Sequence, residues 1–157
     1  ESDLFFSGMR PAVNVGLSVS RVGGAAQTKA MKSASGTIRI DLAQFREMEV
    51  FTQFSSDLDE ETKQQLAYGN GLMELLKQPL GHPMSLAEQV ITLVAATGKL
   101  FLTIPKEQIK ETQGKLLQYF EDVHPEIGET IQKDKVLTDE LRQQILNVAG
   151  EFLEQAK

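Results

Sequence analysis

Apolar residues recur at helical spacing through much of the chain, and this pattern favours a mainly α fold for residues 37–157. The last segment shows it most clearly, because Leu141, Ile145, Val148 and Phe152 follow one another at intervals of about one helical turn. Side chains at this spacing share one face of an α-helix and need a surface to pack against. Since several such stripes follow one another, we expect them to pack together as a helical bundle.

Capping and helix-breaking residues mark where the predicted helices begin and end. Ser85 and Glu88 form a capping box, in which each side chain satisfies a backbone N–H of the other. Proline suits the first turn of a helix, and Ser, Thr or Asp suits the position before it. The first predicted helix runs from about Arg39 to near Phe54, with Leu42, Phe45, Met48 and Phe51 on its inner face. The second runs from the loop 55–59 to Gln78, and the third from Ser85 to near Gly98. The fourth begins at Pro105 with Ile109, Leu116 and Val123 on its inner face, the fifth runs from Pro125 through Ile131, and the last begins at Thr138.

The first 36 residues follow a different pattern. Between Pro11 and Ser20 apolar residues alternate strictly with small or polar ones. A period of two predicts an extended segment with one buried face, here the face of Val13, Val15, Leu17 and Val19. Arg21 follows directly at the end of this segment, next to the hydroxyls of Ser18 and Ser20 and to Gly23 and Gly24. A permanently charged guanidinium in such a place suits a phosphate group, although a lone arginine is more often a solvated surface charge.

Charge is distributed unevenly along the chain. The net charge is −6, but no acidic residue lies between Leu4 and Ile40, where five residues are basic. Uncompensated positive charge beside Gly- and Ser-rich backbone favours an anionic partner. We expect no nucleic acid, because this stretch has no aromatic residues beyond Phe5 and Phe6 on which bases would stack. Residues 51–157 carry the net negative charge, and we expect their acidic side chains to be solvated.

Several classes of site are excluded. The chain has no cysteine, so it has no disulfide, thiol nucleophile or cysteine metal site. No apolar run approaches the length of about 18 residues that a membrane span needs, and no signal peptide is evident. No phosphate-binding loop of the Gly-x-x-x-x-Gly-Lys-Ser/Thr type occurs. His82 and His124 stand alone, so no metal site is predicted. The chain begins with Glu1 rather than methionine, and we expect a fragment.

One run of residues is specific enough to indicate a family. Residues 11–21, PAVNVGLSVSR, with DLFFSGMR before them and VGGAAQTKAMK after them, resemble the alpha subunit of the rotary ATP synthase head, and the resemblance is dense over roughly the first hundred residues. It implies that residues 1–36 are the tail of an α/β nucleotide-binding domain, an extended and loop segment with a short helix. Residues 37–157 would then be the C-terminal helical bundle.

The resemblance also implies a function. The chain would support ATP synthesis or hydrolysis coupled to proton transport, with beta and gamma subunits as partners and ATP or ADP with Mg²⁺ bound in the full assembly. The complex would lie peripherally at the cytoplasmic face of a bacterial plasma membrane or its organellar equivalent. The chain by itself, without a phosphate-binding loop, is expected to hold no cofactor tightly and to be inactive.

Individual residues take roles from the same resemblance. Arg21 would be an arginine finger that acts in trans on nucleotide bound to a beta subunit. Phe5, Arg10, Pro11 and Gln78 would lie near the alpha subunit's own non-catalytic nucleotide site. Two positions depart from the usual pattern, since Leu80 stands where a second glutamine is frequent and Gly71 where an arginine is common. Both departures bear on nucleotide affinity or base selectivity. The acidic segment Asp57–Glu61 is explained either by helix capping or by a contact with the rotating central stalk.

Two other interpretations remain open at this point. A free-standing helical interaction module explains the apolar stripes but leaves the run 11–21 unexplained. The related non-catalytic subunit of a vacuolar-type ATPase, or a secretion ATPase, shares the rotary superfamily. The continuation Val22–Gln27 favours the synthase alpha subunit over both of these relatives.

Overall fold

A computed structural model describes residues 1–52 and 58–155, and within these ranges the chain is helical without any β-strand. The mainly α prediction is confirmed. The helices are α1 (Ser2–Phe6), α2 (Arg21–Ala26), α3 (Lys29–Ala34), α4 (Ile38–Thr52), α5 (Glu60–Leu76), α6 (Leu86–Thr97), the 3₁₀-helix η1 (Lys106–Gln108), α7 (Ile109–Val123), α8 (Pro125–Asp134) and α9 (Asp139–Gln155). None of the helices in the described ranges is long and apolar enough to cross a lipid bilayer.

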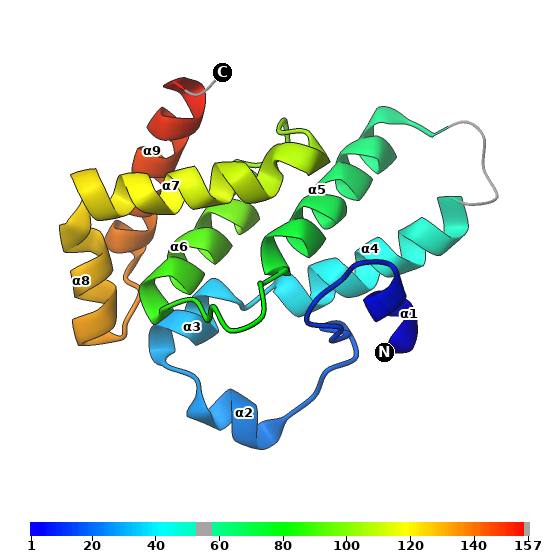
Figure 1. Cartoon of the computed structure of the whole chain (residues 1–157), viewed down its shortest axis with the longest axis horizontal. Helices are drawn as coiled ribbons and strands as arrows, with labels where there is room; N and C mark the ends of the chain where they lie inside the picture. The colour runs from blue at the N-terminus through cyan, green and yellow to red at the C-terminus, as the bar shows by residue number, and fades with distance from the viewer. Residues whose placement is uncertain (53–57, 156–157) are drawn as a thin grey trace.

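Helix α6 forms the centre of the bundle. It contacts α3, α5, α7, α8 and α9, and Figure 1 shows it between α5 and α8. It is apolar on most of its surface, with Val90, Ile91, Val94 and Ala95 all buried. A helix that is hydrophobic nearly all round must be enclosed by others, which explains its central place.

The predicted helix starts are confirmed at three positions. Ser85 Oγ accepts a hydrogen bond from the backbone N–H of Glu88 at 3.2 Å, and the Glu88 carboxylate accepts one from the N–H of Ser85 at 2.6 Å. Asp59 caps α5 through the N–H of Thr62 at 2.7 Å. The Thr138 hydroxyl accepts from the N–H of Leu141 at 3.1 Å at the start of α9. Local sequence was sufficient here because a cap satisfies backbone groups only three residues away.

The ends and faces of two helices differ from the prediction. Phe51, predicted inward, is 76 % exposed, because at this end of α4 the polar residues Thr62 and Gln65 of α5 face it across an open hollow. Val123 is half exposed, since α7 ends there and the chain turns into α8. The predicted end of the first helix near Phe54 lies outside the described residues.

The predicted strand over residues 11–20 is not formed, and this prediction was wrong. Val13, Leu17 and Val19 are exposed, and only Val15 packs against the core. The backbone turns instead, with the N–H of Leu17 bound to the Asn14 side chain at 3.2 Å. A strand needs a neighbouring strand to pair its backbone groups, and the described residues offer none.

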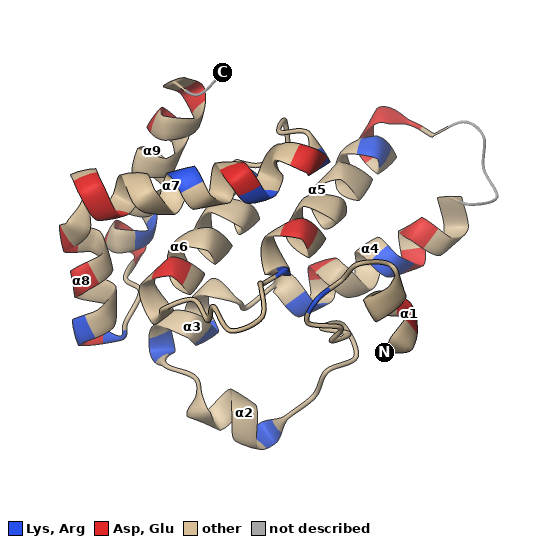
Figure 2. Cartoon of the chain, viewed as in Figure 1, with Lys and Arg blue, Asp and Glu red and all other residues tan. Residues whose placement is uncertain are grey.

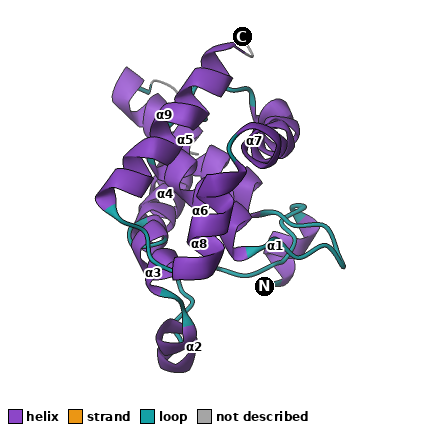
Figure 3. Ribbon diagram, turned by 90° about the vertical axis from the view of Figure 1, so that its left-hand side faces the viewer, coloured by secondary structure: helices purple, strands orange, loops and turns teal. Residues whose placement is uncertain are grey.

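Helices α2 and α3 are adjacent in sequence but differ in their packing. α3 belongs to the core, where Ala30 and Ala34 are buried and the N–H of Ala30 binds the carbonyl of Lys135 at 2.9 Å. Arg142 of α9 donates to both the carbonyl and the hydroxyl of Ser33 at 2.9 Å. α2 buries no residue and projects from the body of the molecule in two perpendicular views (Figures 1 and 3).

Candidate functional site

Arg21 is the first residue of the projecting helix α2. Ser20 precedes it as the N-cap, and its hydroxyl accepts the N–H of Gly23 at 2.9 Å. The Arg21 side chain is exposed, and no carboxylate within the described residues forms an ion pair with it. The arrangement therefore presents a permanent cation on a short capped helix that the rest of the described structure leaves free.

An open hollow of about 480 Å³ lies beside α2, between this helix and α3 and α4. Its lining includes the cations of Lys32 and Arg39 and the hydroxyls of Ser18 and Ser20, and no acidic residue. Figure 2 shows the same asymmetry, since α2 and α3 carry basic residues only, whereas the other labelled helices all include acidic residues. Arg21 itself does not line the hollow.

The four predicted nucleotide-site residues do come together. The Arg10 guanidinium lies over the ring of Phe5, with its Cζ atom 4.4 Å from the ring centroid, at the distance of a cation–π contact. Pro11 follows Arg10 through a cis peptide bond. The N–H of Gln78 donates to the Arg10 carbonyl at 2.9 Å. The end of α5 and the segment after α1 thus meet at one place, and Arg21 is separate from it.

Residues that the sequence reasoning missed lie next to Gln78. Glu74 of α5 is only 9 % exposed, and its carboxylate is 2.7 Å from the ammonium of Lys77 and 3.7 Å from that of Lys106. Lys110 of α7 donates to the backbone carbonyl of Lys77. Burial lowers the pKa of Lys110, and the nearby Glu74 opposes that shift only in part.

A buried amide completes this network. Gln113 is 3 % exposed, accepts from the Lys110 ammonium at 2.7 Å and donates to the hydroxyl of Thr92 at 3.2 Å. The signal in the sequence was its helical register, since position 113 shares the inner face of α7 with Ile109 and Leu116. A polar residue at such a position has to find partners inside the bundle.

The two departures from the family pattern lie in different environments. Gly71 is buried in α5, where an added Cβ atom would lie 3.7 Å from Ile109 Cδ1. Leu80 is fully exposed in the turn after α5. An added Cβ atom at position 71 would thus make an ordinary van der Waals contact with Ile109, whereas the side chain at position 80 is surrounded by solvent.

The acidic segment before α5 acts as a cap. Asp59 caps the start of α5, and the hydrogen bonds from Thr62 lower the pKa of its carboxyl. Glu60 forms an ion pair with Lys63 at 2.7 Å. The capping interpretation is thus confirmed for Asp59, and the stalk contact stays a prediction. Asp57 lies outside the described residues.

Neither histidine has a set of metal ligands around it among the residues that the structure describes. His124 Nδ1 lies 3.2 Å from a Glu126 carboxylate oxygen, and His82 lies in the turn after α5. Over residues 1–52 and 58–155 no group of three or more His, Cys, Asp or Glu side chains is close enough to hold an ion.

The chain is similar to known proteins over nearly its whole length. The family described as ATP synthase alpha/beta chain, C terminal domain, matches residues 27–152. ATP synthase subunit alpha of Lawsonia intracellularis is 53 % identical over 151 residues, which are 96 % of this chain and 30 % of that protein. The subunits alpha of Clostridium kluyveri (50 % over 152 residues, 97 % of this chain) and Rickettsia bellii (49 % over 153 residues, 98 %) are also similar, again over 30 % of their lengths.

The chain thus spans about 30 % of the length of these curated relatives. The match of the family description covers α3 to α9 almost completely, and the helical architecture agrees with it. The protein belongs to the family formed by the C-terminal domains of ATP synthase alpha and beta subunits, and these relatives are alpha subunits.

Proposed function

We propose that this chain is the C-terminal part of an ATP synthase alpha subunit and that Arg21 acts in trans at the catalytic site of a neighbouring beta subunit. The observation that carries this proposal is the exposed cation at the start of α2, which has no partner among the described residues. A guanidinium is suited to charge that develops on a transferred phosphoryl group, because its fork binds two oxygens at once.

The remaining residues fit roles around this one. The bundle α4 to α9 would form a collar below the nucleotide sites and would face the gamma subunit through the acidic start of α5. Phe5, Arg10, Pro11 and Gln78 would contribute to the non-catalytic nucleotide site, where ATP or ADP binds with Mg²⁺. The complex would be peripheral to a membrane, at its cytoplasmic face in bacteria, and would couple ATP turnover to proton transport.

The chain alone is proposed to be inactive, because it has no phosphate-binding loop. The division into a nucleotide-domain tail (residues 1–36) and a bundle (residues 37–157) also remains a proposal. A free-standing interaction module is disfavoured by the family match over residues 27–152.

The test is a reconstituted head of alpha, beta and gamma subunits in which the alpha subunit carries Arg21→Lys. Lysine keeps the charge but loses the two-pronged geometry, so we expect multisite turnover to fall by on the order of 10³-fold while nucleotide binding is largely retained. Arg46→Lys is the control, because it makes the same change at an arginine of α4 that pairs with Glu1 at 3.4 Å and does not line the hollow beside α2, and it should leave turnover near the wild-type value. Unchanged turnover in the Arg21→Lys head would reject the assignment.

A further inference from the structure

One peptide group contacts both the helical bundle and the proposed nucleotide site. It is the peptide between Lys77 and Gln78, directly after α5. Its carbonyl accepts a hydrogen bond from the ammonium of Lys110, and its N–H donates to the carbonyl of Arg10 at 2.9 Å. The plane of this peptide is therefore fixed from both sides, on one side by α7 and on the other by the segment that carries Arg10.

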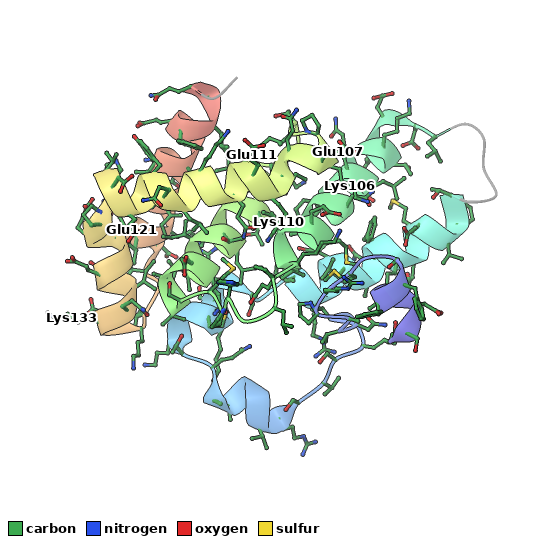
Figure 4. The ribbon with its side chains drawn as sticks, in the orientation of Figure 1. Lys106, Glu107, Lys110, Glu111, Glu121 and Lys133 are labelled. Carbon is green, nitrogen blue, oxygen red and sulfur yellow. The ribbon has the colours of Figure 1, made fainter. Side chains whose placement is uncertain are left out.

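Lys110 is itself held in place by the bundle. Figure 4 shows it on the edge of α7 that faces α5 and α6, with Glu111 on the opposite edge. Its ammonium also donates to the Gln113 amide oxygen at 2.7 Å. The amide nitrogen of Gln113 in turn reaches the Thr92 hydroxyl at 3.2 Å and the Leu75 carbonyl at 3.5 Å. These contacts connect α5, α6 and α7 at one point and leave the ammonium little freedom to move.

The contacts around Lys110 show how its ammonium is accommodated in this half-buried position. Glu74 is the one acidic side chain in contact with this group of lysines within the described residues, and it pairs with Lys77 and Lys106. Lys110 has no carboxylate within ion-pair distance in the same part of the structure, so its charge is satisfied by the oxygens of Lys77 and Gln113. A half-buried cation held by neutral acceptors acts mainly by orienting them, because losing it leaves those acceptors without their donor.

We infer that Lys110 is a positioning residue for Gln78 and thereby sets the affinity and base preference of the non-catalytic nucleotide site. Lys110 does not touch nucleotide in this scheme. It holds the Lys77 carbonyl, and through the shared peptide it fixes the backbone from which the Gln78 side chain extends. The inference rests on the proposed function, since it requires that Gln78 contacts the adenine end of the nucleotide.

The experiment titrates the full alpha subunit that contains this chain with ATP and with GTP. Lys110→Met removes the donor but keeps the apolar stem, and we expect it to weaken ATP binding about tenfold and to reduce the preference for ATP over GTP. Lys110→Arg restores a donor and should recover most of both. Lys115→Met is the matched control, because Lys115 lies on the same helix in an exposed pair with Glu111 at 2.6 Å, and it should behave as wild type.

The variant Gln78→Ala distinguishes a failure of the role of Lys110 from a failure of the proposed nucleotide site. If it weakens ATP binding while Lys110→Met binds ATP and GTP as wild type does, the role of Lys110 is refuted and the proposed site stands. If Gln78→Ala has no effect, the nucleotide role of Gln78 fails, and the inference fails with it. The combination of Gln78→Ala and Lys110→Met should be no weaker than Gln78→Ala alone, and additive losses would show that Lys110 acts independently.

Lys110→Leu, which also lacks a donor, provides the same readout if the methionine variant does not fold. Hydrogen exchange of the Gln78 amide in the 157-residue chain gives a second measurement that needs no nucleotide. Exchange should become faster in Lys110→Met and remain unchanged in Lys115→Met. Equal protection in both variants would overturn the inference.

Discussion

The close approach of helices α4 and α5 depends on a single glycine. An added Cβ atom at Gly69 of α5 would lie 2.1 Å from Cδ2 and 2.6 Å from Cβ of Phe45 on α4. Because the obstructing atoms include the root of the phenyl side chain, rotation of the ring does not relieve the overlap. The helices pack at this distance only because residue 69 has no side chain.

Gly69→Ala is therefore expected to destabilise the chain by about 1–3 kcal/mol, since α4 and α5 must separate. Gly114→Ala is the matched control in α7, where an added Cβ meets nothing within 4 Å. The control should stabilise the chain by about 0.5–1 kcal/mol through helix propensity. Urea denaturation of both variants measures the two changes, and shifts of the same sign would contradict the close approach.

A half-buried phenol makes the stability of the chain sensitive to high pH. The Tyr68 hydroxyl donates to the Asp41 carboxylate at 2.9 Å, joining α5 to α4. Burial, and then the hydrogen bond and charge of Asp41, raise the pKa of Tyr68 well above that of a free tyrosine. In the unfolded chain the phenol ionises near pH 10, as an unperturbed tyrosine does. Ionisation of Tyr68 thus favours the unfolded state.

Stability should accordingly fall as the pH rises above about 10, because the unfolded state releases this proton before the folded state does. Tyr68→Phe is expected to cost about 1 kcal/mol at pH 7, where the hydrogen bond is intact. The variant should then lose less stability than wild type between about pH 9 and pH 11. Denaturation curves at both pH values measure the difference, and parallel losses in the two proteins would exclude this role of Tyr68.

At the scale of the helix, a cap contributes to folding only as far as its helix is packed. Ser85 caps α6, which lies at the centre of the core, and Ser20 caps α2, which buries no residue. Both serines accept a backbone N–H three residues ahead, at 3.2 Å and 2.9 Å. The local chemistry is the same, and only the tertiary setting differs.

Ser85→Ala is expected to lower the global free energy of unfolding by about 1 kcal/mol. Ser20→Ala should leave it unchanged within about 0.5 kcal/mol, since α2 opens without the core. Calorimetry of the two variants compares these values. An equal loss for both would mean that α2 is part of the cooperative unit.

Across the whole molecule, the position of α3 decides where the stable unit begins. The predicted boundary at residues 36/37 places α3 with the leader. However, α3 buries Ala30 and Ala34 in the core and binds α9 through Ser33. Two alanine methyl groups and three hydrogen bonds, including that of the Ala30 N–H to Lys135, together account for about 3 kcal/mol.

Truncation tests this boundary directly. Residues 28–157 should unfold cooperatively, and residues 37–157 should be less stable by about 3 kcal/mol, from loss of the α3 contacts alone. Chemical denaturation of the two truncated chains gives the difference. Equal stability would support a boundary after residue 36 and would assign α3 to the preceding domain.

The helical class and the starts of α5, α6 and α9 follow from the sequence alone. Caps depend on partners three residues away, and the amphipathic stripes of α7 and α9 depend on a fixed helical period, so no distant contact was needed. The run 11–21 indicated the family through its residues alone. Its alternation also predicted a strand, which was wrong because strand formation requires a second segment to pair with.

Only the tertiary structure decided which residues of different helices share a site. The contact of Lys110 with the Lys77 carbonyl joins positions 33 residues apart, and the contact of Gln78 with Arg10 joins the end of α5 to the leader. The exposure of Phe51 and the burial of Gln113 likewise depend on what the neighbouring helix presents at that point. Such contacts follow from how the helices pack, and packing is a property of the assembled core that no single segment contains.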